Sequence, residues 1–250
     1  MQEPQLTIVT GASSNHFACL RNLLLSIRRF EPNTRALVFD LGLSASERQL
    51  VIEGDFECRQ FEFDRYPAHV NIQRNRGEYA WKPIIVTGAL TECGGMVLWL
   101  DAGNLIHGPL RRVREVLSVH GIYTPRSSGR VRDWVHPETL RQLNVAPGLR
   151  SKPNRSGGIV GFNSARTGMM DLASRWKECA LMKECIAPAG SSRKNHRQDQ
   201  AILTILAYQF QRRYGFALED SRLEISVHND QLTMEEAAAR LATTGLAETA

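Results

Sequence analysis

The fold is decided by the stretch at residues 80–105, AWKPIIVTGALTECGGMVLWLDAGNL. Its second half holds an unbroken apolar run from Met96 to Leu100, which follows two glycines and ends abruptly at Asp101. A run this short, bounded in this way, predicts a strand buried on both faces rather than a helix. In open α/β sheets ligands collect just beyond the carboxyl ends of the strands, which makes Asp101 a candidate for ligand or metal binding. The alternative is that Asp101 only opens a turn or caps a helix.

The residues before this strand predict a helix from Tyr79 to Leu90, because apolar side chains recur there at helical spacing. Lys82 and Pro83 fall in its first turn, where proline is tolerated. A lysine in that turn faces whatever lies at the strand ends. The alternative is an ordinary lysine in solvent.

On both sides of this stretch, short apolar runs alternate with helical patterns. Strands are predicted at residues 6–10, 35–41 and 56–63, and helices at residues 16–29, 44–52, 110–119 and 233–241. Two helices begin with capping-box sequences, Ser44 with Glu47 and Thr233 with Glu236. Residues 121–134 predict a strand that leads into a mobile loop. The alternation predicts an α/β fold, a single Rossmann-like domain with a mostly parallel central sheet flanked by helices.

Length and composition agree with one domain. The chain has 250 residues, of which 42% are hydrophobic, enough for a substantial core. A net charge of +5 would suit nucleic acid, an anionic membrane surface or a phosphorylated small molecule. Nucleic acid is not expected, because the basic segments at residues 126–132 and 193–197 lack interleaved aromatic side chains.

Cysteine usage and the N-terminus bear on location. Five scattered cysteines without a C-x-x-C pair indicate neither a zinc site nor a disulfide framework, and they suit a reducing compartment. The first residues, MQEPQL, carry no basic, apolar signal, and no window approaches the roughly 18 apolar residues of a membrane span. We therefore expect a cytoplasmic protein, with peripheral association to the inner membrane as a further option.

The first loop, VTGASSN at residues 9–15, resembles the opening of short-chain dehydrogenases, where a glycine-rich turn approaches a pyrophosphate. Asn15 and Phe17 stand where that turn needs further glycines, and their side chains would block the approach. The usual Tyr-x-x-x-Lys pair is absent, although Tyr79 and Lys82 would share one face of a helix. An NAD(P)-dependent reductase therefore remains an alternative.

Two later segments carry candidate ligand-binding residues. In RSKPNRSGGIVGFN, residues 150–163, Gly157 and Gly158 let backbone approach a ligand before an apolar strand, and the basic residues can neutralise phosphate. The alternative is a flexible hairpin with solvated charges. Further on, Asp199 and Gln200 begin an apolar helix at residues 201–210, where an aspartate otherwise serves as a cap.

The order of TIVTGASS, YAWKP, LWLDAGN, SGGIVGFN and DQAIL resembles the GT-A nucleotide-sugar glycosyltransferases, from about Thr7 to Phe210. The nearest likeness is to the glycogenin-like and lipopolysaccharide galactosyltransferase group and to bacterial proteins that share the WKP and LDAG segments. The resemblance implies a nucleotide-binding half at residues 1–105 and a donor-sugar and acceptor half at residues 106–213. Residues 214–250 form a C-terminal extension.

The resemblance also implies roles for individual residues. It places Asp199 and Gln200 near the anomeric carbon as catalytic residues, and Asp101 as the first acid of a D-x-D motif that binds manganese or magnesium. Gly103 stands at the second acid, so Asn104 and His228 are the remaining candidates for metal ligands, or Lys82 and the arginines replace the metal. The donor-binding residues are expected to be Thr10, Gly11, Ala12, Asp40, Lys82, Gly157, Gly158 and Asn163.

By this resemblance the chain is expected to be a glycosyltransferase that moves a sugar from a nucleoside-diphosphate donor, a UDP-sugar, to a glycan or lipid-linked acceptor. Retention of configuration would place Asp199 or Gln200 against the developing sugar cation. The alternatives are the reductase and a nucleotide-sugar-binding protein without turnover, the second suggested by the missing acid at Gly103.

Overall fold

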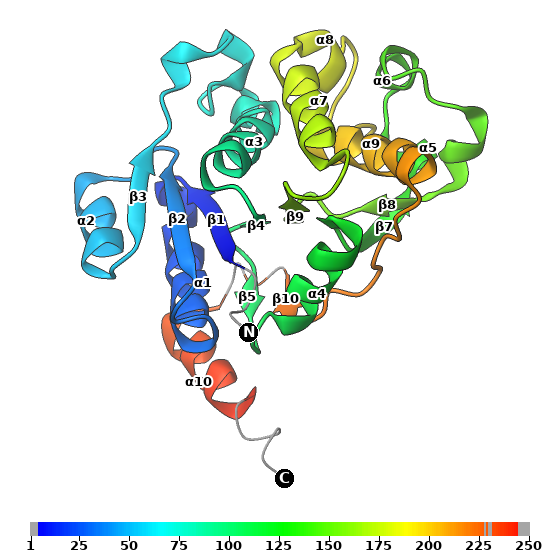
Figure 1. The fold of residues 1–250 in the computed structure, drawn as a ribbon. Helices are drawn as coiled ribbons and strands as arrows, with labels where there is room; N and C mark the ends of the chain where they lie inside the picture. Colours follow the sequence, from blue (N-terminus) through cyan, green and yellow to red (C-terminus); the bar gives the residue numbers. More distant parts are fainter. Residues whose placement is uncertain (1–4, 228, 230–231, 245–250) are drawn as a thin grey trace.

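The structure is a computed structural model that describes residues 5–227, 229 and 232–244. A six-stranded sheet of order β3-β2-β1-β4-β9-β6 forms its centre (Figure 1). The pairs β1–β2, β2–β3 and β1–β4 are parallel, and β9 runs antiparallel to both β4 and β6. The predicted α/β fold with a mostly parallel sheet is confirmed. The sheet strands are β1 (Leu6–Ala12), β2 (Arg35–Asp40), β3 (Glu57–Gln60), β4 (Met96–Leu100), β6 (Ile122–Tyr123) and β9 (Ile159–Asn163).

Helices cover both faces of this sheet (Figure 1). Alternate residues of β4 point to the two sides: Val97 and Trp99 pack in one apolar cluster with α3, α7 and α9, and Leu98 and Leu100 pack in a second cluster with α1 and α4. All five β4 residues are buried, as the apolar run predicts. The α-helices are α1 (Phe17–Phe30), α2 (Ala45–Glu53), α3 (Trp81–Cys93), α4 (Arg111–His120), α5 (Val131–Trp134), α6 (Pro137–Gln142), α7 (Met169–Leu181), α8 (Lys183–Ile186), α9 (Gln198–Tyr214) and α10 (Met234–Thr244).

The two predicted capping boxes are confirmed. Ser44 accepts a hydrogen bond from the Glu47 amide, and Glu47 accepts one from the Ser44 amide. Thr233 and Glu236 make the same reciprocal bonds at the start of α10. Helix α10 packs against α1, so this predicted helix covers the outer surface of the sheet's first helix.

The segment predicted as a mobile loop after β6 instead carries regular structure. Strand β7 (Arg126–Arg130) pairs antiparallel with β8 (Pro153–Arg155), and α5 follows it. The reason is a small apolar cluster in which buried Val131 packs against Ala201 and Ile205 of α9. A second short ladder joins β10 (Ile225–Ser226) to β5 (Leu105–Ile106) just after β4.

A disulfide joins Cys179 to Cys185, which the sequence did not indicate. Helix α7 ends two residues after Cys179, and Met182 adopts an extended conformation before α8 begins. This reversal brings the two Cα atoms to 5.4 Å, a separation that suits a disulfide. Within the described ranges, no helix is both long and apolar enough to cross a membrane.

Candidate functional site

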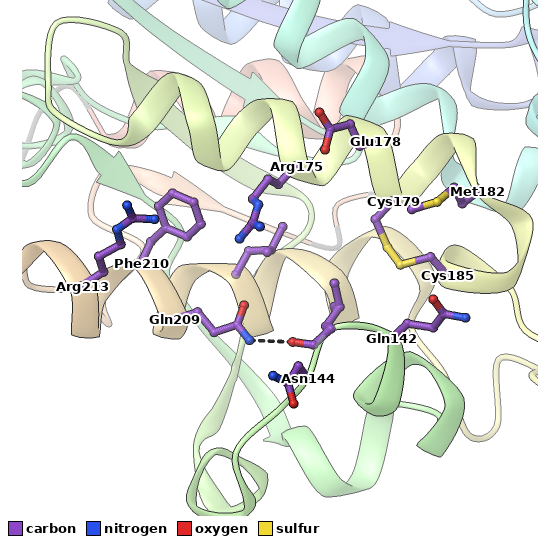
Figure 2. A pocket seen from close by; sticks show the side chains of 12 residues that line it. Gln142, Asn144, Arg175, Glu178, Cys179, Met182, Cys185, Gln209, Phe210 and Arg213 are labelled. Atoms are coloured by element: carbon purple, nitrogen blue, oxygen red, sulfur yellow. Dashed lines mark hydrogen bonds between the residues drawn. A yellow bond between two sulfur atoms is a disulfide. The ribbon is translucent and has the colours of Figure 1, made fainter.

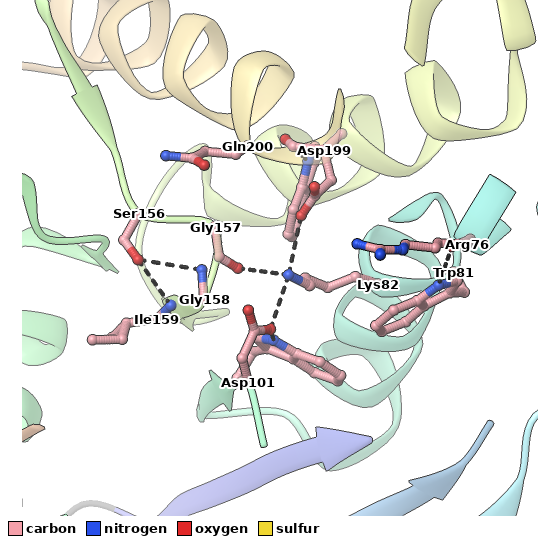
Figure 3. Close-up of polar contacts among 12 residues, drawn as sticks. Arg76, Trp81, Lys82, Asp101, Ser156, Gly157, Gly158, Ile159, Asp199 and Gln200 are labelled. Carbon is pink, nitrogen blue, oxygen red and sulfur yellow. Dashed lines mark hydrogen bonds and ion pairs between the residues drawn. The ribbon is translucent and has the colours of Figure 1, made fainter. Parts of the chain in front are cut away.

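The buried ammonium of Lys82 lies at the centre of the candidate site (Figure 3). Its Nζ atom is 2.9 Å from Asp101 Oδ1 and 3.2 Å from Asp199 Oδ2, and it donates a hydrogen bond of 3.0 Å to the Gly157 carbonyl oxygen. The Lys82 side chain is only 5% exposed, so Lys82 is not an ordinary lysine in solvent. Burial alone would lower the pKa of Lys82, but the two carboxylates raise it above its ordinary value. Lys82 therefore stays charged.

The sheet topology explains how these residues meet. Asp101 follows the carboxyl end of β4, and Gly157 precedes β9, whose antiparallel register sets Ile159 against Leu100. Lys82 is the second residue of α3, and Asp199 the second of α9, so the two helices direct their first turns at the same edge of the sheet. The chain builds β1, β2 and β3 on one side and returns to add β4 on the other, which makes this edge a topological switch point.

Asp101 is fixed by groups on both sides. Its Oδ1 atom accepts a 2.7 Å hydrogen bond from Trp99 Nε1 besides the contact with Lys82. A Cβ atom on Gly158 would lie 2.8 Å from Asp101 Oδ2, so only glycine allows the carboxylate to lie against this backbone. The Gly158 oxygen accepts from the Asp101 amide and from Asn104 Nδ2. The side chain of Asp101 stays 44% exposed and faces the open side of the site.

Asp199 is much more buried than Asp101. Its side chain is 7% exposed, and its Oδ2 atom accepts no hydrogen bond from the described residues, since Lys82 meets it as an ion pair outside hydrogen-bond geometry. Burial raises the pKa of Asp199 to about 6; Lys82 opposes the rise and Asp101 adds to it. A buried acid with an unsatisfied oxygen beside a fixed cation is typical of a functional site.

Gln200, predicted beside Asp199, points away from Lys82 (Figure 3). Its Nε2 atom donates a 2.6 Å hydrogen bond to the Arg155 carbonyl oxygen. Gly157 lies between Lys82 and Gln200. Its carbonyl oxygen accepts from Lys82, and a Cβ atom on Gly157 would be 2.9 Å from the Gln200 Cβ. Asp199 therefore faces the Lys82 side of this loop, and Gln200 the other.

A left-handed turn leads into α3. Residues 75–79 all have positive φ, between 46° and 62°, although only Gly77 is a glycine. A Cβ atom at Gly77 would lie 2.2 Å from the Val70 oxygen, so the turn requires glycine there. Such backbone is strained in residues other than glycine and gathers at functional sites. The turn brings the Tyr79 ring to 5.9 Å from Lys82 Nζ.

A separate cavity of about 420 Å³ lies beside the disulfide, between α7 and α9 (Figure 2). Its charged lining residues, Arg175, Glu178 and Arg213, are all exposed. Lys82, Asp101, Gly157 and Asp199, which together form the Lys82 cluster, do not line this cavity. Because it lacks a buried charged group, the Lys82 cluster is the stronger candidate for chemistry.

Residues 1–87 match a protein family described as a protein of unknown function, DUF1647. No curated protein sequence matches the chain. The fold, in contrast, has clear counterparts among solved structures.

The galactosyltransferase LgtC in complex with donor and acceptor sugar analogs aligns with a TM-score of 0.53 and 18% identity over 95% of each chain. An active-site mutant of LgtC, with glutamate in place of glutamine, gives a TM-score of 0.54 and 17% identity, again over 95% of each. The bifunctional glycosyltransferase WbbM gives 0.56 at 14% identity over 89% of this chain, which spans 40% of the WbbM chain. This chain has the GT-A fold.

The first loop lies at the same edge of the GT-A sheet. The parallel register that sets Val9 against Trp99 carries Thr10, Gly11 and Ala12 to the level of Asp101. All three are buried, and Thr10 Oγ1 has no hydrogen-bond partner among the described residues. Asp40, in contrast, is already engaged: Oδ1 accepts from the amides of Gly42 and Leu43, and Oδ2 from Arg48. Asp40 therefore orders the turn after β2.

Asn163 is not brought to this edge. It pairs with Met96 at the beginning of β4, the opposite end from Asp101. Its Nδ2 atom donates to the Leu117 oxygen, and its Oδ1 atom accepts from the Ala165 amide. We therefore leave Asn163 out of the proposed site.

The geometry expected by the reductase alternative is not found either. Tyr79 and Lys82 do not share a helix face, because Tyr79 lies in the left-handed turn and α3 begins at Trp81. Lys82 is buried between two carboxylates instead of being open to a cofactor. A Cβ atom on Gly11 would be 3.1 Å from the carbonyl oxygen of Phe39 in the neighbouring strand β2, so this glycine serves strand packing and not the approach of a cofactor.

The donor atoms around Asp101 fit a divalent cation poorly. Among the described residues, no group of three or more His, Cys, Asp or Glu could hold a metal ion. Asn104, buried after the strand, donates its amide to Gly158, and His228, the third expected ligand, lies outside the described residues. In the part of the chain that the structure describes, the carboxylates at the cluster are Asp101 and Asp199, and an ammonium already lies between them. The expected manganese or magnesium site gains no support from these groups.

The sequence reasoning missed the surroundings of the cluster. It did not single out Trp99, whose indole holds Asp101, or Trp176, whose Nε1 atom donates to the backbone carbonyl oxygen of Asp199. It also missed the left-handed turn that carries Arg76 and Tyr79. The only local signal for that turn was Gly77, since positive φ in other residues leaves little trace in a sequence.

Proposed function

We propose that the protein is a glycosyltransferase that moves a sugar from a UDP-sugar to a glycan or lipid-linked saccharide. The observation that carries the proposal is the buried Lys82 held between Asp101 and Asp199 at the switch point of the sheet. Support also comes from the GT-A fold, which the chain shares with a galactosyltransferase solved with donor and acceptor sugar analogs.

The charges of the cluster suit this chemistry. As a glycosidic bond to a diphosphate breaks, negative charge develops on the departing oxygens and positive charge on the sugar. A fixed ammonium stabilises the negative charge on the departing oxygens without moving during the reaction, and Lys82 supplies this ammonium. A carboxylate stabilises the positive charge on the sugar. Asp199 is the buried candidate for this role, and Gln200 is the alternative. A carboxylate on the face opposite the departing diphosphate would leave the departure face open to the acceptor, and the reaction would retain configuration.

A binding and turnover assay tests this proposal. Purified protein is titrated with UDP, NADH and NADPH by calorimetry and then incubated with UDP-glucose and UDP-galactose while UDP release is followed. We expect UDP to bind, neither nicotinamide cofactor to bind, and one UDP-sugar to be split. Binding of NADH or NADPH without UDP would favour the reductase instead.

Single substitutions test which of Asp199 and Gln200 takes part in donor hydrolysis. Asp199→Asn should lose donor hydrolysis by at least about tenfold while keeping UDP binding, because Asp199 acts on the sugar. Gln200→Glu reports whether the amide takes part. Glu115→Gln, on the exposed face of α4, is the matched control and should behave as wild type. UDP binding without turnover of any tested sugar would identify a binding protein.

A further inference from the structure

We propose that the donor diphosphate is neutralised by protein cations, Lys82 with Arg76 and Arg193, and needs no divalent metal. This inference rests on the proposed function and concerns the same site. It follows from two features, the way in which the acids near β4 are already engaged and the set of cations that gathers around Tyr79.

The atoms that follow β4 are largely committed to the protein itself. Asp101 Oδ1 receives both Lys82 and Trp99, which leaves only Oδ2 for another cation. Two residues later Gly103 carries no side chain, and its carbonyl oxygen accepts a 3.0 Å hydrogen bond from the Asn229 amide. The Asp101 carbonyl oxygen accepts from the Asn104 amide. For a metal at this turn, the described residues therefore offer at most Asp101 Oδ2 and the Asn104 side-chain oxygen, since Asn104 bonds to Gly158 through its nitrogen, and no second carboxylate.

The ammonium of Lys82 already has the contacts that a bound cation would make. Its Nζ atom lies 2.9 to 3.2 Å from three oxygens, those of the two carboxylates of Asp101 and Asp199 and of the Gly157 carbonyl. A divalent ion on the remaining oxygen of Asp101 would lie within a few ångströms of this charge and be repelled by it. A metal could not displace the Lys82 ammonium from this position, because the side chain is buried and its helix begins at the adjacent residue.

Two arginines add to this charge from neighbouring segments. Arg193, in the loop before α9, places its guanidinium 5.9 Å from the centre of the Tyr79 ring, the same distance as Lys82 Nζ. Arg76 donates a 3.2 Å hydrogen bond to the hydroxyl of Tyr79, whose ring lies 5.9 Å from Lys82 Nζ. Neither arginine has a carboxylate partner in the part of the chain that the structure describes. Both are exposed, so their charges are available to an anion.

The strained turn gives this arrangement a physical cause. Arg76 and Tyr79 both have positive φ, and Glu78 within the same turn accepts a 3.4 Å hydrogen bond from Gln198, the first residue of α9. The turn is thus tied to the helix that carries Asp199. Strain of this kind persists only where the surrounding structure enforces it, and here it directs Arg76 and Tyr79 to the Lys82 cluster.

The first test measures UDP and uridine affinity by calorimetry in excess EDTA and in excess Mn²⁺. We expect UDP to bind equally in both, within about twofold, and more tightly than uridine, because the protein supplies the charges that the diphosphate needs. Titration of Mn²⁺ into the protein with UDP present, followed by the electron paramagnetic resonance of free Mn²⁺, should show no uptake. A tenfold or larger gain in UDP affinity with Mn²⁺ would overturn the inference.

The second test uses the ratio of UDP to uridine affinity, because a merely structural role would weaken both ligands alike. Arg76→Gln and Arg193→Gln should each lower this ratio by about tenfold, the loss expected for one charge-assisted contact. Arg212→Gln, an exposed arginine at the other end of α9, is the matched control and should leave the ratio unchanged. An unchanged ratio in both test variants would exclude the arginines from the diphosphate site.

The outcomes separate this inference from the proposed function. UDP binding that requires Mn²⁺ leaves the glycosyltransferase proposal intact and removes only the metal-independent site. Failure of UDP and uridine to bind in either medium removes the proposed function, and the inference with it. Tight UDP binding in EDTA, with a lower ratio of UDP to uridine affinity in the two arginine variants, supports both.

Discussion

Lys82 Nζ lies 3.2 Å from Asp199 Oδ2, and both side chains are buried. The pair joins the first turns of α3 and α9, two helices that cover the same face of the sheet. Taking two charges out of water costs free energy that their attraction only partly returns, so such pairs are poor sources of stability. A buried pair of this kind at a switch point is typical of binding and catalytic sites.

Replacing Lys82 should affect both stability and binding. Lys82→Met leaves Asp199 buried without its cation, and breaking a buried pair in this way costs about 3 kcal/mol of the free energy of unfolding. Urea denaturation measures this loss, and the same variant should lose UDP binding in calorimetry. Lys183→Met, at an exposed position in α8, should change neither by more than about 0.5 kcal/mol. A stable Lys82→Met variant with wild-type affinity would contradict the site.

Asp199 should make stability depend on pH. Its pKa is raised from the ordinary value of 3.8 to about 6, so the folded protein keeps a proton in this range that the unfolded chain has released. The stability that Asp199 contributes is therefore full below pH 3.8 and falls as the pH rises through about 6. Relative to Asp199→Asn, the wild type should lose about 3 kcal/mol between pH 4 and pH 7 in urea unfolding. A constant difference between the two proteins would show that Asp199 titrates normally.

Gly158 should matter more for activity than for folding. In Gly158→Ala the new methyl group would meet Asp101 Oδ2 at 2.8 Å, and the carboxylate, as a flexible side chain, can move aside. We expect a stability change under about 1 kcal/mol but at least a tenfold loss of donor hydrolysis, since Asp101 would leave Lys82. In the control Gly88→Ala, nothing lies within 4 Å, and the helix should gain about 0.5 to 1 kcal/mol with activity unchanged. Equal activities in the two variants would count against the role of Asp101.

The sequence predicted the strands, the first helices and the placement of Lys82 and Asp101 at one edge, because apolar runs and sharp charged ends mark the edge of a parallel sheet. Asp199 was expected near the ligand only from the family resemblance. It could not predict strand direction. If β9 ran parallel to β4, Asn163 would lie at the ligand edge; antiparallel pairing brings Gly158 there and sends Asn163 to the opposite end. The left-handed turn at residues 75–79 was equally hidden, because tertiary contacts, not local propensity, hold it.

His196 should give the opposite pH dependence to Asp199. It is fully buried in neutral form: Nδ1 accepts from the His136 amide at 3.2 Å, and Nε2 lies 2.9 Å from the Ile186 oxygen, to which it donates. Burial lowers the pKa of His196 from its ordinary value of 6.5 to about 4, because the charged imidazolium would lose its hydration in this position.

Between pH 6.5 and about 4 the unfolded chain binds a proton at His196 that the folded protein does not, so the stability that His196 contributes is lost as the pH falls. Relative to His196→Gln, the wild type should lose about 3 kcal/mol on going from pH 7 to pH 4. Since Asp199→Asn changes the profile in the opposite direction over the same range, each variant is the control for the other in urea unfolding. Profiles that shift in the same direction would show that the pKa of one of the two groups is displaced in the opposite sense to that expected here.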